Sequence, residues 1–210
     1  MKWRVIDDVT LRHPFNAVVS GPSQSGKTHW VKTLITSGKI TPEIEKILFY
    51  YSEWQPLYDK MTRFVEFHQG LPSSLPDGKK RTLIILDDLM VESSGNKDIT
   101  LLFTRGTHHK NCSVVLITQN FFEKGLRTIT LNSHYLVIMK SKRTLSQLSA
   151  LARQLYSKNA NFLVESYEDV AKEPGRGYLF LDLKPETEED LSVFSNIFSE
   201  NGMPTSLYTQ

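Results

Sequence analysis

The sequence contains the octapeptide Gly21-Pro22-Ser23-Gln24-Ser25-Gly26-Lys27-Thr28. It fits the phosphate-binding loop pattern G-x-x-x-x-G-K-[ST]. The short apolar run 15–20 before it is typical of a buried strand, and Val31, Leu34 and Ile35 after it recur at helical spacing. Strand, glycine loop and helix are the context that the pattern needs. We therefore predict that backbone N–H groups of residues 21–28 bind phosphate oxygens at the N-terminus of a helix.

Two side chains of the octapeptide have predicted roles. Lys27 would place a positive charge at the β- and γ-phosphates of a nucleotide, and Thr28 would offer its hydroxyl group to Mg²⁺. The alternative interpretation is an ordinary Gly/Ser turn that caps a helix.

Composition limits the classes of protein to consider. With 210 residues, the chain is long enough for one domain around one sizeable core, which we place at about residues 13–187. A formal net charge of +2 neither requires nor excludes a nucleic-acid partner. The single cysteine, Cys112, cannot form an internal disulfide, and we predict that it fills space in the core. The chain lacks a long apolar run and the apolar core of a signal peptide, so we expect a soluble intracellular protein without membrane contact.

Further apolar runs predict an α/β fold. Buried strands are expected over 47–51, 83–86, 113–118, 134–139 and 177–182, with a minor strand at 64–67 and an edge strand or lead-in at 3–13. Helices are expected over 98–109, over 145–155 and, with an acidic composition, over 188–198 in the C-terminal segment 188–210. Because strands alternate with helices, we predict a mainly parallel sheet with helices on both faces.

The phosphate loop, the acids Asp87-Asp88 and Gln119 each directly follow a predicted strand, namely 15–20, 83–86 and 113–118. Ligands bind at the carboxyl ends of the strands in such sheets. Asp87 is the candidate for holding the Mg²⁺ shell, and Asp88 is the candidate for polarising the attacking water. Asp88 could instead cap the following helix or be merely solvated. Because aspartate is shorter than the glutamate that is usual in this role, Glu53 and Glu92 are reserve candidates for the base.

Gln119 and Arg105 are candidates for contacting the transferred phosphate. Gln119 follows the strand 113–118 and could touch the γ-phosphate or the attacking water, or it could only bond a loop. Arg105 could reach the nucleotide of a neighbouring subunit as an arginine finger, or it could form a surface salt bridge. His108 and His109 lack partners at metal-ligand spacing, which argues against a zinc site.

Basic residues follow two of the predicted strands, one group beside the aromatic pair Phe121-Phe122. The candidates for contacting nucleic-acid phosphates are Lys124, Arg127, Lys140, Lys142 and Arg143. The alternative is that these charged loops are only solvated.

In these motifs the chain resembles the genome-packaging ATPases of double-stranded DNA viruses and of virus-like Maverick/Polinton elements, within the FtsK–HerA superfamily. The resemblance covers about residues 13–187. It is carried by the blocks 14–28, 86–90, 103–111 and 116–120, with 131–137 and 177–185 similar to later family blocks. The glycine loop alone would indicate only a nucleotide. The arginine-bearing helix followed by a strand and Thr118-Gln119 points to this superfamily.

The resemblance implies a RecA-like core of the ASCE type, in which the strand 113–118 lies between the other two motif strands. It implies ATP and Mg²⁺ as cofactors, a homo-oligomeric ring, expected to be a hexamer, and double-stranded DNA in the central channel. On the family pattern Gln119 is the sensor and Arg105 the finger, while Asp88 stands where many members carry glutamate. A capsid or portal-type protein would be the partner at the site of virus assembly in the host cell.

We therefore predict an ATP-hydrolysing DNA translocase that packages a viral or virus-like genome. The alternatives are a P-loop kinase of small molecules or nucleotides, and a nucleotide-dependent switch or adaptor with little hydrolysis. Stimulation of ATP hydrolysis by double-stranded DNA would distinguish the translocase from both.

Overall fold

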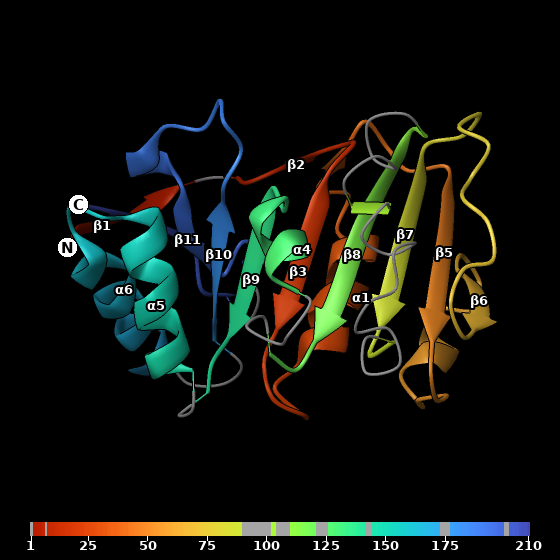
Figure 1. The fold of residues 1–210 in the computed structure, drawn as a ribbon, viewed down its shortest axis with the longest axis horizontal. Helices are drawn as coiled ribbons and strands as arrows, with labels where there is room; N and C mark the ends of the chain where they lie inside the picture. Colours follow the sequence, from red (N-terminus) through yellow and green to blue (C-terminus); the bar gives the residue numbers. More distant parts are fainter. Residues whose placement is uncertain are drawn as a thin grey trace.

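A ten-stranded sheet forms the centre of the computed structural model, which describes residues 2–6, 8–89, 102–103, 110–120, 126–141, 144–172, 177–199 and 202–210 (Figure 1). The strands lie side by side in the order β1 (Lys2–Ile6), β12 (Thr205–Thr209), β11 (Val193–Ser195), β10 (Tyr178–Asp182), β9 (Tyr135–Met139), β3 (Asn16–Ser20), β8 (Cys112–Thr118), β7 (Thr82–Asp87), β5 (Lys46–Tyr51) and β6 (Glu66–Gln69). A separate short pair is formed by β2 (Leu11–Arg12) and β4 (Ile40–Thr41).

The strands from β9 to β6 form a parallel sheet, as the alternation of strands and helices predicts. β8 lies between β3 and β7, which is the order that the family resemblance implies. All residues of β3, β7 and β8 are buried, because both faces of this part of the sheet are covered. The arrowheads of β3, β8, β7 and β5 point to one edge of the sheet, so polar residues that follow these strands are brought together there (Figure 1).

The strands from β10 to β1 are antiparallel, and here the structure corrects a prediction. The acidic helix expected over 188–198 is wrong: this segment forms the 3₁₀ turn η3 (Glu189–Leu191) and then β11. Val193 and Phe194 point to opposite faces of the sheet, into two different apolar clusters, as the two-residue period of a strand requires. Pairing of β11 with β10 therefore overrides the helical preference of the acidic residues before it.

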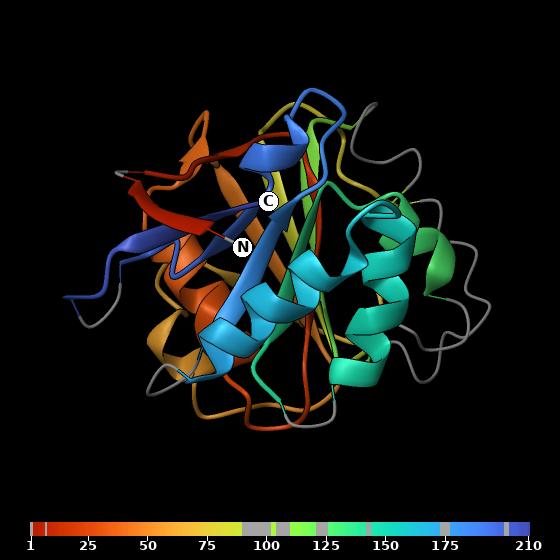
Figure 2. The same cartoon turned by 90° about the vertical axis from the view of Figure 1, so that its left-hand side faces the viewer.

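Helices cover both faces of the sheet, as predicted (Figure 2). On one face lies α1 (Lys27–Thr36), whose Trp30, Val31 and Leu34 are buried in an apolar cluster. On the other face lie α4 (Arg127–Leu131), α5 (Leu145–Leu155) and α6 (Ala160–Lys172), of which α4 and α6 were not predicted (Figures 1 and 2). None of the helices in the described part of the chain has the length and apolar character needed to cross a bilayer.

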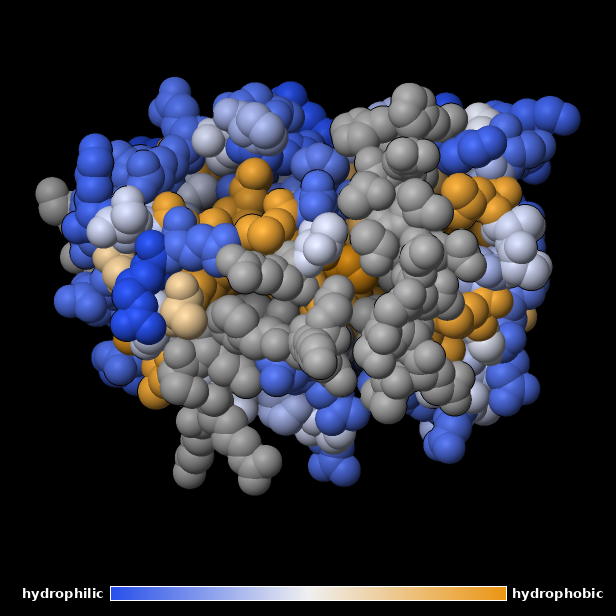
Figure 3. Space-filling view, in the orientation of Figure 1, coloured by the Kyte–Doolittle hydropathy of each residue, from blue (hydrophilic) through white to orange (hydrophobic). Residues whose placement is uncertain are grey.

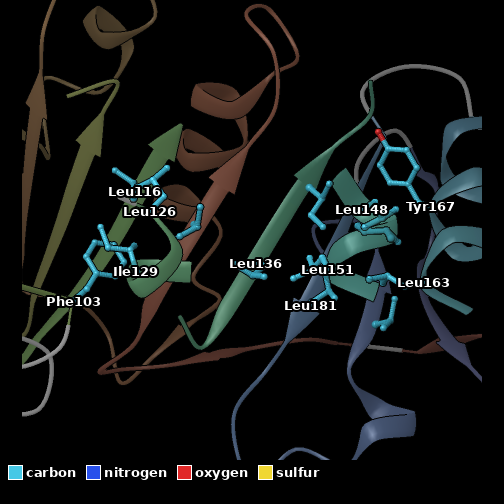
Figure 4. Close-up of a cluster of buried hydrophobic side chains, with 14 of the residues drawn as sticks. Phe103, Leu116, Leu126, Ile129, Leu136, Leu148, Leu151, Leu163, Tyr167 and Leu181 are labelled. Carbon is cyan, nitrogen blue, oxygen red and sulfur yellow. The ribbon is translucent and has the colours of Figure 1, made fainter. Parts of the chain in front are cut away.

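The cluster beneath α4, α5 and α6 contains Ile129, Leu148 and Leu163, which pack onto the sheet (Figure 4). Leu102 and Phe103 belong to the same cluster. The rest of the helix predicted over 98–109 lies outside the described residues. On this face hydrophobic side chains are visible among hydrophilic ones in the space-filling view (Figure 3). The two clusters together fix the strands whose ends carry the candidate site.

Candidate functional site

The phosphate loop begins where β3 ends, at the same edge as the ends of β8 and β7. The N–H group of Gly21 donates to the carbonyl oxygen of Thr118 at 3.2 Å. The N–H group of Asp88 donates to the carbonyl oxygen of Ile117 at 3.3 Å. The loop, the paired acids and the end of the strand that precedes Gln119 are therefore joined through the backbone of β8.

The loop needs glycine at its first position because the chain passes close to β9. A Cβ atom on Gly21 would lie 2.6 Å from Cβ of Met139 and 2.8 Å from Oγ of Ser25. Near the end of the loop, Gln24 and Gly26 have φ angles of 65° and 101°, in the left-handed region. These turns bring the chain into the first residue of α1.

The N-terminus of α1 has the properties of an anion site. Gly26 precedes the helix, no side chain of the described residues caps it, and its first turn holds no acidic residue. The first N–H groups of a helix have no intrahelical acceptor, and the helix dipole favours a negative charge there. Ser25 Oγ is buried without a hydrogen-bond partner in the described part of the chain. A phosphate group fits this set of donors.

Lys27 is held inside the loop by two carbonyl groups. Its Nζ atom donates to the carbonyl oxygens of Gly21 at 2.7 Å and Pro22 at 2.9 Å. Burial lowers the pKa of the Lys27 ammonium, and the nearby carboxylates of Asp87 and Asp88 act in the opposite direction. The side chain thus lies between the loop and the two acids, where the sequence predicts the phosphates.

Asp87 lies at the end of β7 and contacts Thr28, which lies at the start of α1. The hydroxyl group of Thr28 donates to Asp87 Oδ2 at 3.3 Å, and the hydroxyl group of Tyr58 donates to the same oxygen at 2.7 Å. Asp87 is only 4% exposed; burial raises the pKa of its carboxyl group, and the two hydrogen bonds counteract this. Among the described residues both bonds fall on Oδ2, which leaves Oδ1 for another ligand. A hydroxyl and a carboxylate are oxygen donors that suit Mg²⁺.

Asp88 and Gln119 also form a pair, across the neighbouring ends of β7 and β8. Gln119 Nε2 donates to Asp88 Oδ2 at 3.3 Å. Asp88 is exposed and has a φ angle of 54°, a conformation that costs energy for a residue other than glycine and is often found at functional sites. The structure thus brings the candidate base and the candidate sensor into contact. Their roles stay predictions, because this contact also suits a simple link between strand ends.

The structure describes only some of the remaining candidate residues. Glu53 is exposed and follows β5, whose last residue, Tyr51, pairs with Asp87. Lys140 directly follows β9 and therefore lies at the edge of the phosphate loop. Arg127 begins α4, but its side chain is not described. Glu92, Arg105, His108, His109, Lys124, Lys142 and Arg143 lie outside the described residues.

Tyr58 is the residue of the site that sequence reasoning missed. The structure places it in the 3₁₀ turn η1 (Tyr58–Lys60), between β5 and β6. No motif marks it. The one available signal was the density of aromatic residues between positions 49 and 67, which suggests a packed cluster but does not indicate that one hydroxyl group reaches Asp87.

A scan against protein-family models and a search of curated proteins each return no match. Solved structures do match. The genome-packaging NTPase B204 of Sulfolobus turreted icosahedral virus 2, in complex with ATPγS, has a TM-score of 0.57 at 13% identity, covering 87% of this chain and 96% of that one. B204, the DNA-packaging ATPase of Sulfolobus turreted icosahedral virus, has a TM-score of 0.58 at 13% identity, with 88% and 98% covered.

A secretion protein gives a comparable fold match. The cytoplasmic domain of the type VII secretion ATPase EccC from Thermomonospora curvata has a TM-score of 0.54 at 12% identity, covering 87% of this chain but 27% of that one. At these identities the likeness concerns the fold. The prediction from the sequence motifs is confirmed at that level: the chain has a P-loop NTPase fold and resembles in it the viral genome-packaging NTPase B204.

Proposed function

We propose that this chain is an ATPase that drives double-stranded DNA into a viral or virus-like capsid. The observation that carries the ATPase part is the meeting of three groups at one sheet edge. They are the phosphate loop with Lys27, the Thr28–Asp87 pair, and the Asp88–Gln119 pair. A phosphate cradle, oxygen donors for a metal and a carboxylate for water are the parts that hydrolysis of a phosphoanhydride needs.

Each residue has a role that follows from its position. The N–H groups of the loop and of α1 bind the phosphates, and Lys27 adds its charge at the β- and γ-phosphates. Thr28 and Asp87 would hold Mg²⁺, which when bound neutralises phosphate charge. Asp88 orients the attacking water and takes up its proton, and Gln119 holds the Asp88 carboxylate in place while it senses the γ-phosphate.

The packaging part rests on the likeness to B204, whose structures are described as those of a genome-packaging NTPase and DNA-packaging ATPase. By analogy, we propose a homo-oligomeric ring, expected to be a hexamer, with Arg105 completing a neighbour's site. Double-stranded DNA would pass through the ring, with Lys124, Arg127, Lys140, Lys142 and Arg143 as candidate phosphate contacts. A capsid or portal-type protein would bind the ring at the site of virus assembly inside the host cell.

The test is the rate of ATP hydrolysis, measured as phosphate release, with and without double-stranded DNA. We expect DNA to raise the rate, and Lys27→Ala to show no hydrolysis under either condition. If the rate does not respond to DNA over a range of salt concentrations, the translocase is excluded but the ATPase is not. If folded wild-type protein releases no phosphate at all, the ATPase itself is excluded.

A further inference from the structure

Tyr58 contacts the candidate metal site from outside the recognised motifs. Its hydroxyl group donates to Asp87 Oδ2 at 2.7 Å, a shorter bond than the 3.3 Å bond from Thr28 to the same oxygen. Thr28 is itself a candidate metal ligand. Of the two side chains in the described residues that donate to Asp87, Tyr58 is therefore the one that can orient the carboxylate without also binding the metal.

The ring of Tyr58 is held in one place by other aromatic side chains. Its centroid lies 4.8 Å from that of Phe49, 5.2 Å from that of Phe67 and 5.4 Å from that of Trp54. The Tyr58 side chain is fully buried, at 0% exposure. A ring packed on several sides has little rotational freedom, so its hydroxyl group presents a fixed donor to Asp87.

We propose that Tyr58 is a positioning residue that holds the Asp87 carboxylate in the orientation that binds the divalent cation of a nucleotide complex. The inference rests on the proposed function of the site. Groups that hydrogen-bond to metal ligands fix the orientation of those ligands, and their loss typically costs about 10- to 100-fold in metal affinity or activity. Tyr58 thus ties the packing of the β5–β6 connection to the geometry of the metal site.

A purely structural role makes a different prediction. If Tyr58 only fills the core, Asp87 serves as the hydrogen-bond acceptor that the buried hydroxyl group needs. Removing that hydroxyl group would then change the free energy of unfolding but not metal binding. Tyr58→Phe separates the two roles, because it keeps the ring and its contacts with Phe49, Tyr51, Trp54 and Phe67 and removes only the hydroxyl group. The matched control is Tyr156→Phe. Tyr156 directly follows α5, away from the site, and its buried hydroxyl group forms a hydrogen bond with Ser192 Oγ at 2.7 Å.

The experiment measures Mn²⁺ binding to the protein with ADP by electron paramagnetic resonance. ADP binding in EDTA is measured separately by fluorescence anisotropy of a labelled nucleotide. For Tyr58→Phe we expect the dissociation constant of Mn²⁺ to rise by roughly 10-fold or more, while ADP binding in EDTA changes by less than about twofold. For Tyr156→Phe we expect both constants to stay within about twofold of wild type.

The possible outcomes separate this inference from the proposed function. Unchanged Mn²⁺ binding by Tyr58→Phe would overturn the positioning role while leaving the ATPase proposal intact. An equal loss in Tyr156→Phe would also overturn it, because the effect would then be general. A Tyr58→Phe protein that circular dichroism shows to be unfolded, beside a folded Tyr156→Phe, would assign Tyr58 to the core. Wild type that binds no nucleotide under any condition would remove the proposed function as well.

Discussion

Lys27 makes contacts that can be removed without loss of core packing. Its ammonium group bonds two loop carbonyls, and its side chain is only partly buried. We expect Lys27→Ala to abolish nucleotide binding or turnover while the melting temperature stays within a few degrees of wild type. Lys32→Ala, five residues later on the same helix and partly exposed, is the control and should bind and hydrolyse ATP normally. Normal turnover by folded Lys27→Ala would contradict the assignment of the phosphate loop.

Asp88 can be distinguished from Asp87 by whether its substitution affects hydrolysis or metal-dependent ATP binding. Asp88→Asn keeps the size of the side chain and removes the carboxylate that would orient water, so we expect near-normal ATP binding and a fall in hydrolysis of roughly 10²- to 10⁴-fold. Binding by equilibrium dialysis and single-turnover hydrolysis would measure the two steps. Loss of metal-dependent ATP binding would mean that Asp88 is instead a metal ligand.

The same experiment on Glu53→Gln tests the reserve candidate for the base. Glu53 is exposed at the same edge of the sheet, so its position alone does not exclude it. We expect Glu53→Gln to hydrolyse ATP at the wild-type rate. A large loss there, together with an active Asp88→Asn, would transfer the role of base to Glu53.

Cys112 offers a test of the core at the start of β8. It is fully buried, and burial raises the pKa of its thiol to about 11. Because the folded pKa lies above that of an unfolded thiol, the resulting contribution to stability is present below the unfolded pKa and is lost as the pH rises through about 11. At pH 8 we expect no reaction with Ellman's reagent in the native state and one thiol per chain after denaturation. Rapid labelling of native protein would show that β8 is not buried as described.

At the scale of elements, the junction of α6 and β10 depends on a close approach. A Cβ atom on Gly177, the residue before β10, would lie 2.8 Å from both the carbonyl oxygen and Cγ1 of Val170 on α6. We expect Gly177→Ala to lower the free energy of unfolding by roughly 1–3 kcal/mol, since overpacking forces the backbone to shift. Urea denaturation followed by circular dichroism would measure it. A substitution without effect would mean that α6 can move away from the sheet at little cost.

The elements that the sequence predicts best are those with a strong local signal. The octapeptide 21–28 and the apolar runs that end at Asp87 and Thr118 predict three neighbouring strands and the edge where they meet. Each strand is a continuous apolar run because it is buried on both faces, which is a pattern that one sequence displays without knowledge of its neighbours.

The elements that the sequence predicts poorly depend on partners far along the chain. Residues 193–195 form a strand because β10 and β12 pair with them on either side, whereas the acidic residues before them favour a helix locally. Tyr58 reaches Asp87 because the β5–β6 connection folds back over the end of β7, which no local pattern encodes. Interactions of this kind are decided by tertiary packing rather than by propensity.

At the scale of the whole molecule, Asn16 and Ser20 define the two ends of β3 and hence two edges of the sheet. The phosphate loop follows Ser20 at one edge. At the other, Asn16 Nδ2 donates to the carbonyl oxygen of Phe103 at 2.6 Å. Arg105 lies outside the described residues, two positions after Phe103 in the sequence. A strand of five residues spans about 13 Å between its end residues, so Phe103 contacts the end of β3 opposite to the phosphate loop.

We expect Arg105→Ala to bind ATP and barely hydrolyse it, because an arginine supplied to the transferring phosphate accelerates the reaction by roughly 10³- to 10⁵-fold. Mixing distinguishes action in trans from action within one subunit. Lys27→Ala lacks its own pocket but keeps its arginine, whereas Arg105→Ala keeps its pocket. In a mixed ring some interfaces combine an intact pocket with an intact arginine, so part of the activity should return when the two inactive variants are combined.

The control for the mixing experiment is the state of assembly. Light scattering must show that the mixed subunits form an assembly of the same size as wild type, since subunits that stay apart cannot complement one another. Assembled mixtures without activity would contradict action in trans and leave Arg105 as a residue of its own subunit. Recovery that rises and then falls with the proportion of Arg105→Ala, peaking in mixed rings, would show that the enzyme is complete only between neighbouring copies. Hydrolysis would then depend on contact between copies of the chain, as the proposed ring-shaped DNA translocase requires.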